Sequence, residues 1–331
     1  MKAAVYRPGL PLQIEERQAP EPGPGEVRVR IVRAGVCGTD RHILEGGFPA
    51  RAGVILGHES AGIVDALGRG VDGLAPGDTV ALDPNRPCHR CRACRGGRTH
   101  LCTRLESLGV TRDGGFAPFT VAPAESVYAL PAGLTPAEAS LAEPLSCCIH
   151  GVDVLSPRLG DHAVVLGLGA IGLMIVQLLR ARGVSRILGV DPDAARRRRA
   201  EALLEEVLAP SDLDPASAGP REVVVEASGA PRALEQALSL VDDGGSVLQF
   251  GVMDPSVRVP LSPYDLFRRE IRLVGAFTNP QTFARALESL ARRIVDPDTI
   301  LGDDLELEEL PAYLAGSVHP GGLKHGVRFP D

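Results

Sequence analysis

The sequence predicts an α/β protein in which a β-rich, loop-rich part accompanies a doubly wound parallel sheet. Residues 1 to about 145 contain short alternating segments separated by many prolines and glycines. Residues 146–276 instead alternate short apolar runs with helical patterns, which is typical of a parallel sheet. At 331 residues, the chain is long enough for two domains, each with its own core.

The expected elements follow from the local patterns. In the first part, apolar and charged residues alternate over 27–32, with similar segments at 54–64 and 79–82, and these predict half-buried strands. In the second part we expect strands over 162–166, 186–190, 222–226 and 246–250, and helices over 172–182, 194–207 and 231–241. A further helix is expected over 280–293, followed by a short mixed tail.

Composition excludes several classes of protein. Hydrophobic residues make up 44% and charged residues 23%, as in soluble globular proteins. The net charge of -7 argues against a nucleic-acid partner, and no apolar run has the roughly 18 residues of a membrane span. The amino-terminal residues lack the apolar stretch of a signal peptide. Seven cysteines, an odd number with four of them clustered, favour a reducing cytoplasm over a disulfide framework.

Four of these cysteines form the most specific pattern in the chain, Cys88-x2-Cys91-x2-Cys94-x7-Cys102. Thiolates at such short spacing converge on one soft cation, and four-coordinate Zn²⁺ is the expected ion. A site with four protein ligands has no open position. The cluster therefore predicts a structural zinc rather than a catalytic one.

A glycine-rich loop follows the expected strand 162–166. It reads Gly167-Leu168-Gly169-Ala170-Ile171-Gly172. Glycines at these spacings permit a tight turn, close approach of a pyrophosphate, and close packing of the following helix. Asp191 ends the next strand, where a carboxylate accepts hydrogen bonds from an adenosine ribose and repels a 2′-phosphate. This predicts NAD rather than NADP, although Arg196 could pair with a phosphate.

A second metal site is expected from Cys37, His58 and Glu59. Singly, each has a simpler interpretation, as a core thiol, a hydrogen-bonded polar group or a surface charge. Together they are typical of a catalytic zinc, which needs about three protein ligands and an open position to polarise an alcohol oxygen. Neighbouring residues fit supporting roles in this chemistry. Thr39 and His42 could pass a proton to solvent, and Asp40 could orient a metal-bound imidazole.

These motifs, with Glu143-Pro144-Leu145, resemble the medium-chain zinc-dependent alcohol dehydrogenases, and among them the polyol (sorbitol, xylitol, arabitol) dehydrogenase branch. The resemblance covers nearly the whole chain. It implies a GroES-like catalytic domain from residues 1–145 and 277–331, with a structural zinc lobe at about 84–104. It also implies a Rossmann NAD-binding domain over 146–276, and homodimers or homotetramers that pair through the edge of its sheet.

The resemblance also implies roles for particular residues. Cys37 and His58 would bind the catalytic zinc, and Glu59 and Glu143 are further candidates, of which either could ligate directly. Thr39 and His42 fall where the family keeps its proton relay, and Asp40 where it supports the ligand histidine. In addition to the glycine loop, Asp191 and Arg196, the cofactor cleft would include Ser228, Gly251 and Phe277.

The leading hypothesis is a cytoplasmic enzyme with two zinc ions and NAD that oxidises a secondary hydroxyl of a polyol or sugar-like alcohol to a ketone. The same chemistry on threonine, an aldose, an aminocyclitol or a simple alcohol is the alternative. A different class, a non-enzymatic protein that binds zinc and a dinucleotide, would have no use for Thr39 and His42 beside an open metal site. A zinc-free quinone reductase of the same superfamily is disfavoured because it would not need these zinc ligands.

Overall fold

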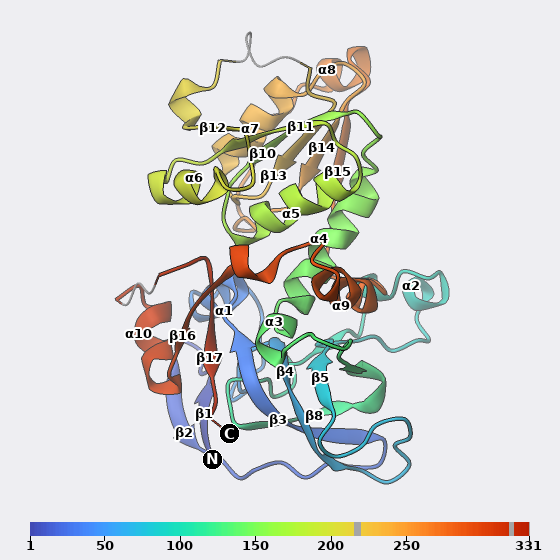
Figure 1. Cartoon of the computed structure of the whole chain (residues 1–331), viewed down its shortest axis with the longest axis vertical. Coiled ribbons are helices and arrows are strands. Elements are labelled where there is room, and N and C mark those ends of the chain that lie inside the picture. Colours follow the sequence, from blue (N-terminus) through green and yellow to red (C-terminus); the bar gives the residue numbers. More distant parts are fainter. Residues whose placement is uncertain (215–219, 318–320, 331) are drawn as a thin grey trace. The chain divides into compact units, whose positions relative to one another are not determined.

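The computed structural model describes residues 1–214, 220–317 and 321–330. Within these residues the chain divides into two compact units, one formed by Met1–Ser146 with Pro280–Asp331 and one by Cys147–Asn279 (Figure 1). The domain boundaries expected from the sequence were 145/146 and 276/277. The predicted fold class, a β-rich unit with an α/β unit, is confirmed.

The first unit is built on a sheet that, within the described residues, has seven strands in the order β16-β17-β3-β4-β5-β9, with β8 also paired to β3. Its strands are β1 (Lys2–Val5), β2 (Gln13–Glu16), β3 (Glu26–Gly35), β4 (Glu59–Leu67), β5 (Thr79–Leu82), β6 (Asn85–Arg86), β7 (Glu106–Ser107), β8 (Phe119–Pro123), β9 (Val127–Ala129), β16 (Leu301–Leu305) and β17 (Lys324–Arg328). Its helices are α1 (Gly38–Leu44), α2 (Arg92–Arg95), α3 (Pro136–Ala139), α9 (Phe283–Ala291) and α10 (Leu310–Leu314), while α4 (Ala142–Leu155) runs on into the second unit.

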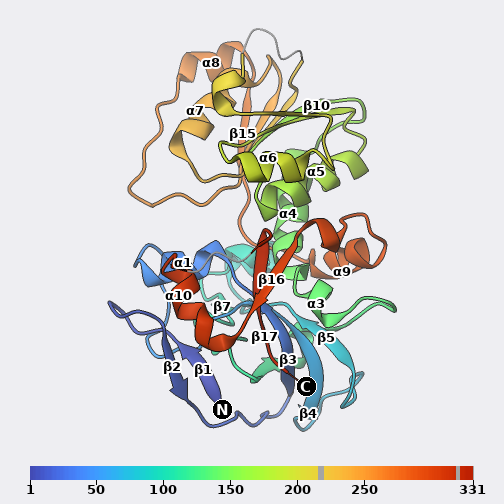
Figure 2. The same ribbon diagram turned by 60° about the vertical axis from the view of Figure 1, so that its left-hand side comes forward.

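The long strand β3 shows why this sheet forms. Along it, apolar residues such as Val27, Val29 and Ile31 are fully buried, while the arginines between them are more exposed. This is the expected alternation of a strand with one face in the core. At its end, Gly35 pairs with Glu59 of β4, and Gly326 of β17 pairs with Gly35 on the other side. Figure 2 shows β16 and β17 beside β3.

The second unit is a six-stranded, wholly parallel sheet in the order β12-β11-β10-β13-β14-β15 within the described residues. Its strands are β10 (His162–Leu166), β11 (Arg186–Val190), β12 (Glu206–Leu208), β13 (Val223–Glu226), β14 (Ser246–Gln249) and β15 (Arg272–Gly275). Its helices are α5 (Ala170–Ala181), α6 (Ala194–Ala200), α7 (Pro231–Leu240) and α8 (Pro263–Arg268). The reversal of strand order beside β10 is the point at which such sheets bind nucleotides.

Some elements differ from expectation. The helix expected over 194–207 ends at Ala200, and residues 206–208 form β12 instead, because the arginine-rich turn gives way to an apolar segment that pairs with β11. The strand expected over 54–64 begins only at Glu59, since Gly57 takes a left-handed φ of 93°. No helix among the described residues is long and apolar enough to cross a membrane.

Candidate active site

Cys37 lies at the amino-terminal cap of α1, directly after strand β3. The carboxylate of Asp40 accepts a hydrogen bond from the Cys37 backbone N–H at 2.9 Å, which closes the first turn of the helix. The Cys37 thiol donates to Thr39 Oγ1 at 3.5 Å. The Cys37-x-Thr39-Asp40 segment therefore places a thiol, a hydroxyl and a carboxylate on one short turn.

His58 approaches this turn from the loop before β4. A side chain at Gly57 is impossible here, because a Cβ would lie 2.8 Å from the Phe116 ring. The buried His58 ring has Nδ1 at 3.6 Å from Asp40 Oδ1, which leaves Nε2 as the nitrogen available to a metal. Burial alone would lower the pKa of His58, but nearby Cys37 and Asp40 raise that pKa well above its ordinary value.

Glu59 is fully buried at the start of β4, and its two oxygens have different surroundings. Oε1 accepts a hydrogen bond from the ammonium of Lys324, on β17, at 2.6 Å. Oε2 is buried and has no hydrogen-bond partner among the described residues. Burial alone would lower the pKa of Lys324, but Glu59, then Cys37 and Glu143, raise that pKa above its ordinary value.

Cys37, His58 and Glu59 come together as predicted, since one donor atom from each lies within 4.8 Å of the others. A thiolate sulfur, an imidazole nitrogen and a carboxylate oxygen form a donor set that suits Zn²⁺. The unpartnered Glu59 Oε2 is an oxygen that a cation would satisfy. Glu143 of α4 is near enough to influence Lys324, but it is outside this group as the described residues are arranged.

The two predicted relay residues both lie on α1. Thr39 is half-buried beside the Cys37 sulfur. The His42 side chain is 39% exposed, and its Nδ1 lies 3.9 Å from Glu45 Oε2. Helix α1 thus begins beside the half-buried ligand Cys37 and carries a partly exposed histidine in its last turn.

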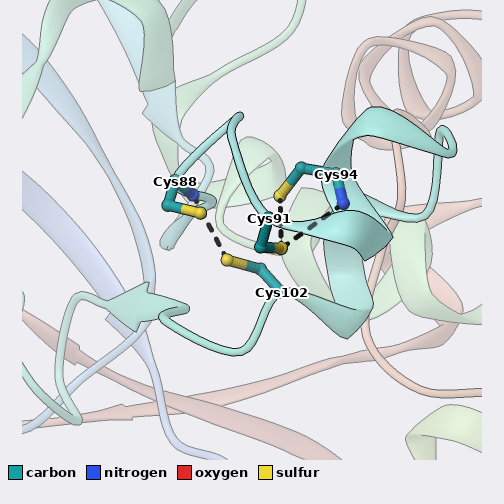
Figure 3. A group of neighbouring side chains, drawn as sticks. All are labelled: Cys88, Cys91, Cys94 and Cys102. Atoms are coloured by element: carbon teal, nitrogen blue, oxygen red, sulfur yellow. Dashed lines mark hydrogen bonds between the residues drawn. The ribbon is translucent and has the colours of Figure 1, made fainter.

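The four clustered cysteines converge as the sequence predicts, with their sulfurs within 4.8 Å of one another (Figure 3). Cys91 caps the short helix α2, where its sulfur accepts from the Cys94 N–H at 3.5 Å. The Cys102 sulfur accepts from the N–H groups of Cys88 and Arg104, each at 3.3 Å. Backbone donors directed at sulfur are the usual second layer around a thiolate–zinc centre.

These hydrogen-bond donors, together with burial, change the pKa values of the cysteine thiols. Backbone N–H groups, first that of Arg90, lower the pKa of Cys88 to about 5. Similar hydrogen bonds, first from the Cys94 N–H, lower the pKa of Cys91 to about 7, whereas burial raises the pKa of Cys94 to about 12. The hydrogen bonds around Cys88 and Cys91 thus favour the thiolate form, which is the form that binds a metal.

Glycine occurs at each of three positions in the 167–172 loop for a different physical reason. Gly167 has a φ of 103°, and a Cβ there would lie 2.8 Å from the Ser228 nitrogen. A Cβ on Gly172 would lie 1.9 Å from the Gly167 oxygen. A Cβ on Gly169, the cap of α5, would contact nothing within 4 Å. The protein itself thus does not require glycine at 169, whereas a pyrophosphate at the helix amino terminus would.

Asp191 lies directly after β11 and is almost fully buried. Its Oδ2 accepts from the Leu168 N–H and its Oδ1 from the Asp193 N–H, both at 2.8 Å. The Arg196 guanidinium lies 3.7 Å from Oδ2 and is half exposed. Asp191 therefore fixes the glycine loop to the end of β11, and each oxygen keeps a further lone pair for a ligand.

The remaining residues predicted to contact the cofactor follow the carboxyl ends of β13, β14 and β15. Ser228 donates its hydroxyl to Glu226 at 2.5 Å, and a Cβ on Gly251 would lie 2.1 Å from the Gly229 nitrogen. Phe277 is 49% exposed after β15. The first two residues thus belong to one closely packed pair of loops.

Sequence reasoning missed Lys324, which lies 265 residues after its partner Glu59. A signal was available: Lys2 and Lys324 are the only lysines in a chain that otherwise uses arginine. The strand that carries Lys324 is held by buried Arg33, which donates to the Lys324 carbonyl at 3.0 Å and to Asp304 at 2.6 Å.

Comparison with protein families gives two matches. Residues 23–132 match the alcohol dehydrogenase GroES-like domain, and residues 170–292 match the zinc-binding dehydrogenase family. The first contains Cys37, His58, Glu59 and the four clustered cysteines, and the second contains most of the parallel sheet.

Individual relatives cover most or all of the chain. D-arabinitol dehydrogenase 1 of Uromyces fabae is 33% identical over 99% of this chain and 97% of its own length. D-altritol 5-dehydrogenase of Agrobacterium fabrum is 36% identical over 81% of each chain. A solved zinc-binding dehydrogenase from Sinorhizobium meliloti 1021, bound to NADP, has 35% identity and a TM-score of 0.95 over 99% of both chains.

Proposed function

The chain belongs to the zinc-dependent medium-chain alcohol dehydrogenases, and from this premise we propose that it oxidises a secondary hydroxyl of a polyol or sugar-like alcohol to a ketone. It is an oxidoreductase that acts on a small-molecule alcohol with zinc and NAD(P). When bound, zinc supplies a Lewis acid for an alcohol oxygen, and the dinucleotide supplies the hydride acceptor. The protein contributes binding, orientation and a proton route.

The observation that carries this proposal is the group of Cys37, His58 and Glu59, with an unpartnered buried oxygen on Glu59. These residues would hold the catalytic zinc. Glu143 would complete the site from α4, and its contribution to raising the pKa of Lys324, the partner of Glu59, supports this role. Cys88, Cys91, Cys94 and Cys102 would hold the structural zinc.

Thr39 and His42 would move the alcohol proton. The Thr39 hydroxyl, beside the Cys37 sulfur, would accept this proton, and His42, whose side chain is 39% exposed, would pass it to solvent. Asp40 would orient His58 for metal binding, since its carboxylate is fixed by the Cys37 N–H.

The dinucleotide would bind to the second unit. Its pyrophosphate would lie against Gly167, Gly169, Ala170, Ile171 and Gly172, at the amino terminus of α5. Asp191 would accept from the ribose hydroxyls, and Ser228, Gly251 and Phe277 would border the nicotinamide. We propose NAD, because the buried carboxylate of Asp191 opposes a 2′-phosphate. Arg196, beside it, makes NADP the second cofactor to test.

We also propose a homodimer or homotetramer in a reducing cytoplasm. Within the described residues β15 is an edge strand, and Leu273 on it is 39% exposed, with Phe267 and Tyr264 of the preceding α8 at 79% and 69%. An apolar edge of this kind fits pairing with the same strand of a second copy. Cys37, Cys88, Cys91, Cys94 and Cys102 form no disulfide among the described residues, which fits a reducing compartment.

The test is NADH and NADPH formation by the zinc-loaded protein across sorbitol, xylitol, arabitol, ribitol, inositols, threonine, glucose and simple alcohols. We expect turnover with NAD on one or more polyols. Turnover confined to threonine, glucose or a simple alcohol would keep the chemistry and refute the polyol assignment. Absence of turnover from a protein that binds both zinc ions and NADH would favour a binding protein.

A further inference from the structure

Glu226 is a fully buried carboxylate at the end of β13, in the middle of the parallel sheet. A buried charge is costly unless hydrogen bonds or an opposite charge compensate it. Here the compensating partners are neutral donors from the ends of two strands, as far as the described residues show. The Glu226 carboxylate therefore binds loop N–H and O–H groups instead of pairing with a cation.

The two oxygens of Glu226 serve different loops. Oε1 accepts from the Ser228 N–H at 2.8 Å, the Ser228 hydroxyl at 2.5 Å and the Gly229 N–H at 2.8 Å. Oε2 accepts from the Gln249 side-chain amide at 3.0 Å. The same amide nitrogen donates to the Gly251 carbonyl at 2.6 Å. Glu226 thus holds the loop after β13 directly and the loop after β14 through Gln249.

The orientation of the Gln249 amide is settled by its surroundings. Both neighbours of its nitrogen, the Glu226 carboxylate and the Gly251 carbonyl, can only accept. Its oxygen is buried without a partner among the described residues. The contact with Glu226 and Gly251 therefore holds Gln249 in place at the cost of one unsatisfied acceptor.

The loops around Glu226 are packed as closely as backbones allow. A Cβ on Gly251 would lie 2.1 Å from the Gly229 nitrogen and 2.7 Å from Glu226 Oε2. A Cβ on Gly167 would lie 2.8 Å from the Ser228 nitrogen. The loops at the carboxyl ends of β10, β13 and β14 thus form one assembly, at the edge of the sheet where this fold binds dinucleotides.

We propose that Glu226 and Gln249 are positioning residues that set these three loops for the dinucleotide. This inference rests on the proposed cofactor site. Glu226 acts through Ser228, Gly229 and Gly251 rather than by touching the cofactor. Its loss should therefore weaken dinucleotide binding and leave the alcohol and zinc sites unchanged.

The first test is Glu226→Gln, which keeps the shape of the side chain. If its oxygen still accepts from Ser228 and Gly229, its new amide faces the Gln249 amide, so that donor opposes donor. We expect the Kd for NADH and the KM for NAD to rise about tenfold. The kcat, the KM for the alcohol and the zinc content should stay close to those of the wild type.

Gln249→Leu provides a second, milder variant that keeps the proposal testable if Glu226→Gln folds poorly. It frees the Gly251 loop while Glu226 still holds Ser228, so the Kd for NADH should rise less than with Glu226→Gln. In the double variant the two effects should be less than additive, because both act through one contact.

The matched control is Arg221→Met, two residues before the start of the same strand. Arg221 is buried and donates to the Leu240 carbonyl, and it precedes β13, whereas the loops follow the other end of that strand. The Arg221→Met variant should have a lower unfolding temperature and an unchanged Kd for NADH. If Glu226→Gln and Gln249→Leu also lower only the unfolding temperature, the inference is wrong. If the wild type itself fails to bind NADH and NADPH, the proposed cofactor site fails instead.

Discussion

Lys324 Nζ lies 2.6 Å from Glu59 Oε1, and this contact joins β17 to β4 through two buried side chains. Lys324 places a positive charge directly beside Glu59, one of the three metal ligands. It also leaves only one Glu59 oxygen for a cation, because Oε1 is already occupied.

Removing this charge should destabilise the zinc-free protein. Lys324→Met leaves a buried carboxylate without its partner, which costs about 3–5 kcal/mol. Zinc should restore much of the loss, since it supplies positive charge to Glu59. Urea unfolding with and without zinc measures both effects. Lys2→Met, which removes the exposed partner of Glu308, is the control and should change little. Equal losses in the two variants would refute a special role for Lys324.

Gly35 leaves room for the Glu59 side chain. A Cβ on Gly35 would lie 2.2 Å from Glu59 Oε2, the oxygen proposed to face zinc. We expect Gly35→Ala to reduce zinc from two ions per chain to about one, because the structural cluster is untouched. Elemental analysis checks this. Gly38→Ala, where a Cβ meets nothing within 4 Å, should keep both ions, and a full zinc content in Gly35→Ala would contradict the geometry.

The two proposed zinc sites should fail in different ways. Cys37→Ser should lose one zinc and abolish turnover, while the fold is kept. Cys94→Ser should also lose one zinc, but its main effect should be faster proteolysis of the lobe at 84–104, because the metal holds that lobe together. Zinc content, turnover and a protease time course separate the two. Full activity and zinc content in Cys37→Ser would rule out the catalytic assignment.

The glycine loop offers a test in which fold and function separate. Gly169→Ala adds a Cβ that contacts no protein atom, so stability should be unchanged while the KM for NAD rises about tenfold through crowding of the pyrophosphate. Gly172→Ala adds a Cβ 1.9 Å from the Gly167 oxygen and should lower the unfolding temperature. An unchanged KM in Gly169→Ala would place the pyrophosphate elsewhere.

Glu138 should make stability depend on pH. Burial would raise its pKa, but hydrogen bonds from Thr135 and the Arg293 guanidinium lower the pKa of Glu138 below its ordinary value of 4.5. A carboxylate with a depressed pKa in the folded state adds stability above pH 4.5 that is lost as pH falls through the folded value.

Glu138→Gln should therefore unfold about 1–2 kcal/mol more easily at pH 7, and the difference from wild type should shrink below pH 4.5. Urea unfolding between pH 3 and 7 measures this difference. Glu308→Gln, at an exposed ion pair, is the matched control and should show little effect at any pH. A gap for Glu138→Gln that persists at pH 3 would mean that lost packing, not charge, is responsible.

Elements of the fold could be predicted where neighbouring residues in the sequence determine them. The alternation along β3 and the strand–loop–helix pattern around Gly167–Gly172 are local, and the structure has both. The end of the helix after Asp193 and the strand β17 depend on pairing with distant strands, which periodicity does not reveal. The sequence pattern therefore predicts too long a helix after Asp193, and only a mixed tail where the structure has β16 and β17.

The residues of the site also differ in whether the sequence alone could predict them. Ligand residues with motif spacing, such as Cys88 with Cys91 and Cys37 with Asp40, could be found because chemistry is concentrated in a few neighbouring positions. Lys324 and Glu226 could not, since each acts through partners brought near by the sheets. Their roles are properties of strand register rather than of sequence motifs.

The unit that carries the metal ligands is discontinuous, with Cys147–Asn279 lying between its two segments. During synthesis, the ribosome therefore releases the complete parallel-sheet unit before β17 emerges to pair with β3. The nascent chain must hold Cys37, His58 and Glu59 without Lys324 for as long as those intervening residues take to be made. At roughly 5–20 residues per second this is a wait of several seconds or more, during which chaperones or early zinc capture could protect the unfinished sheet.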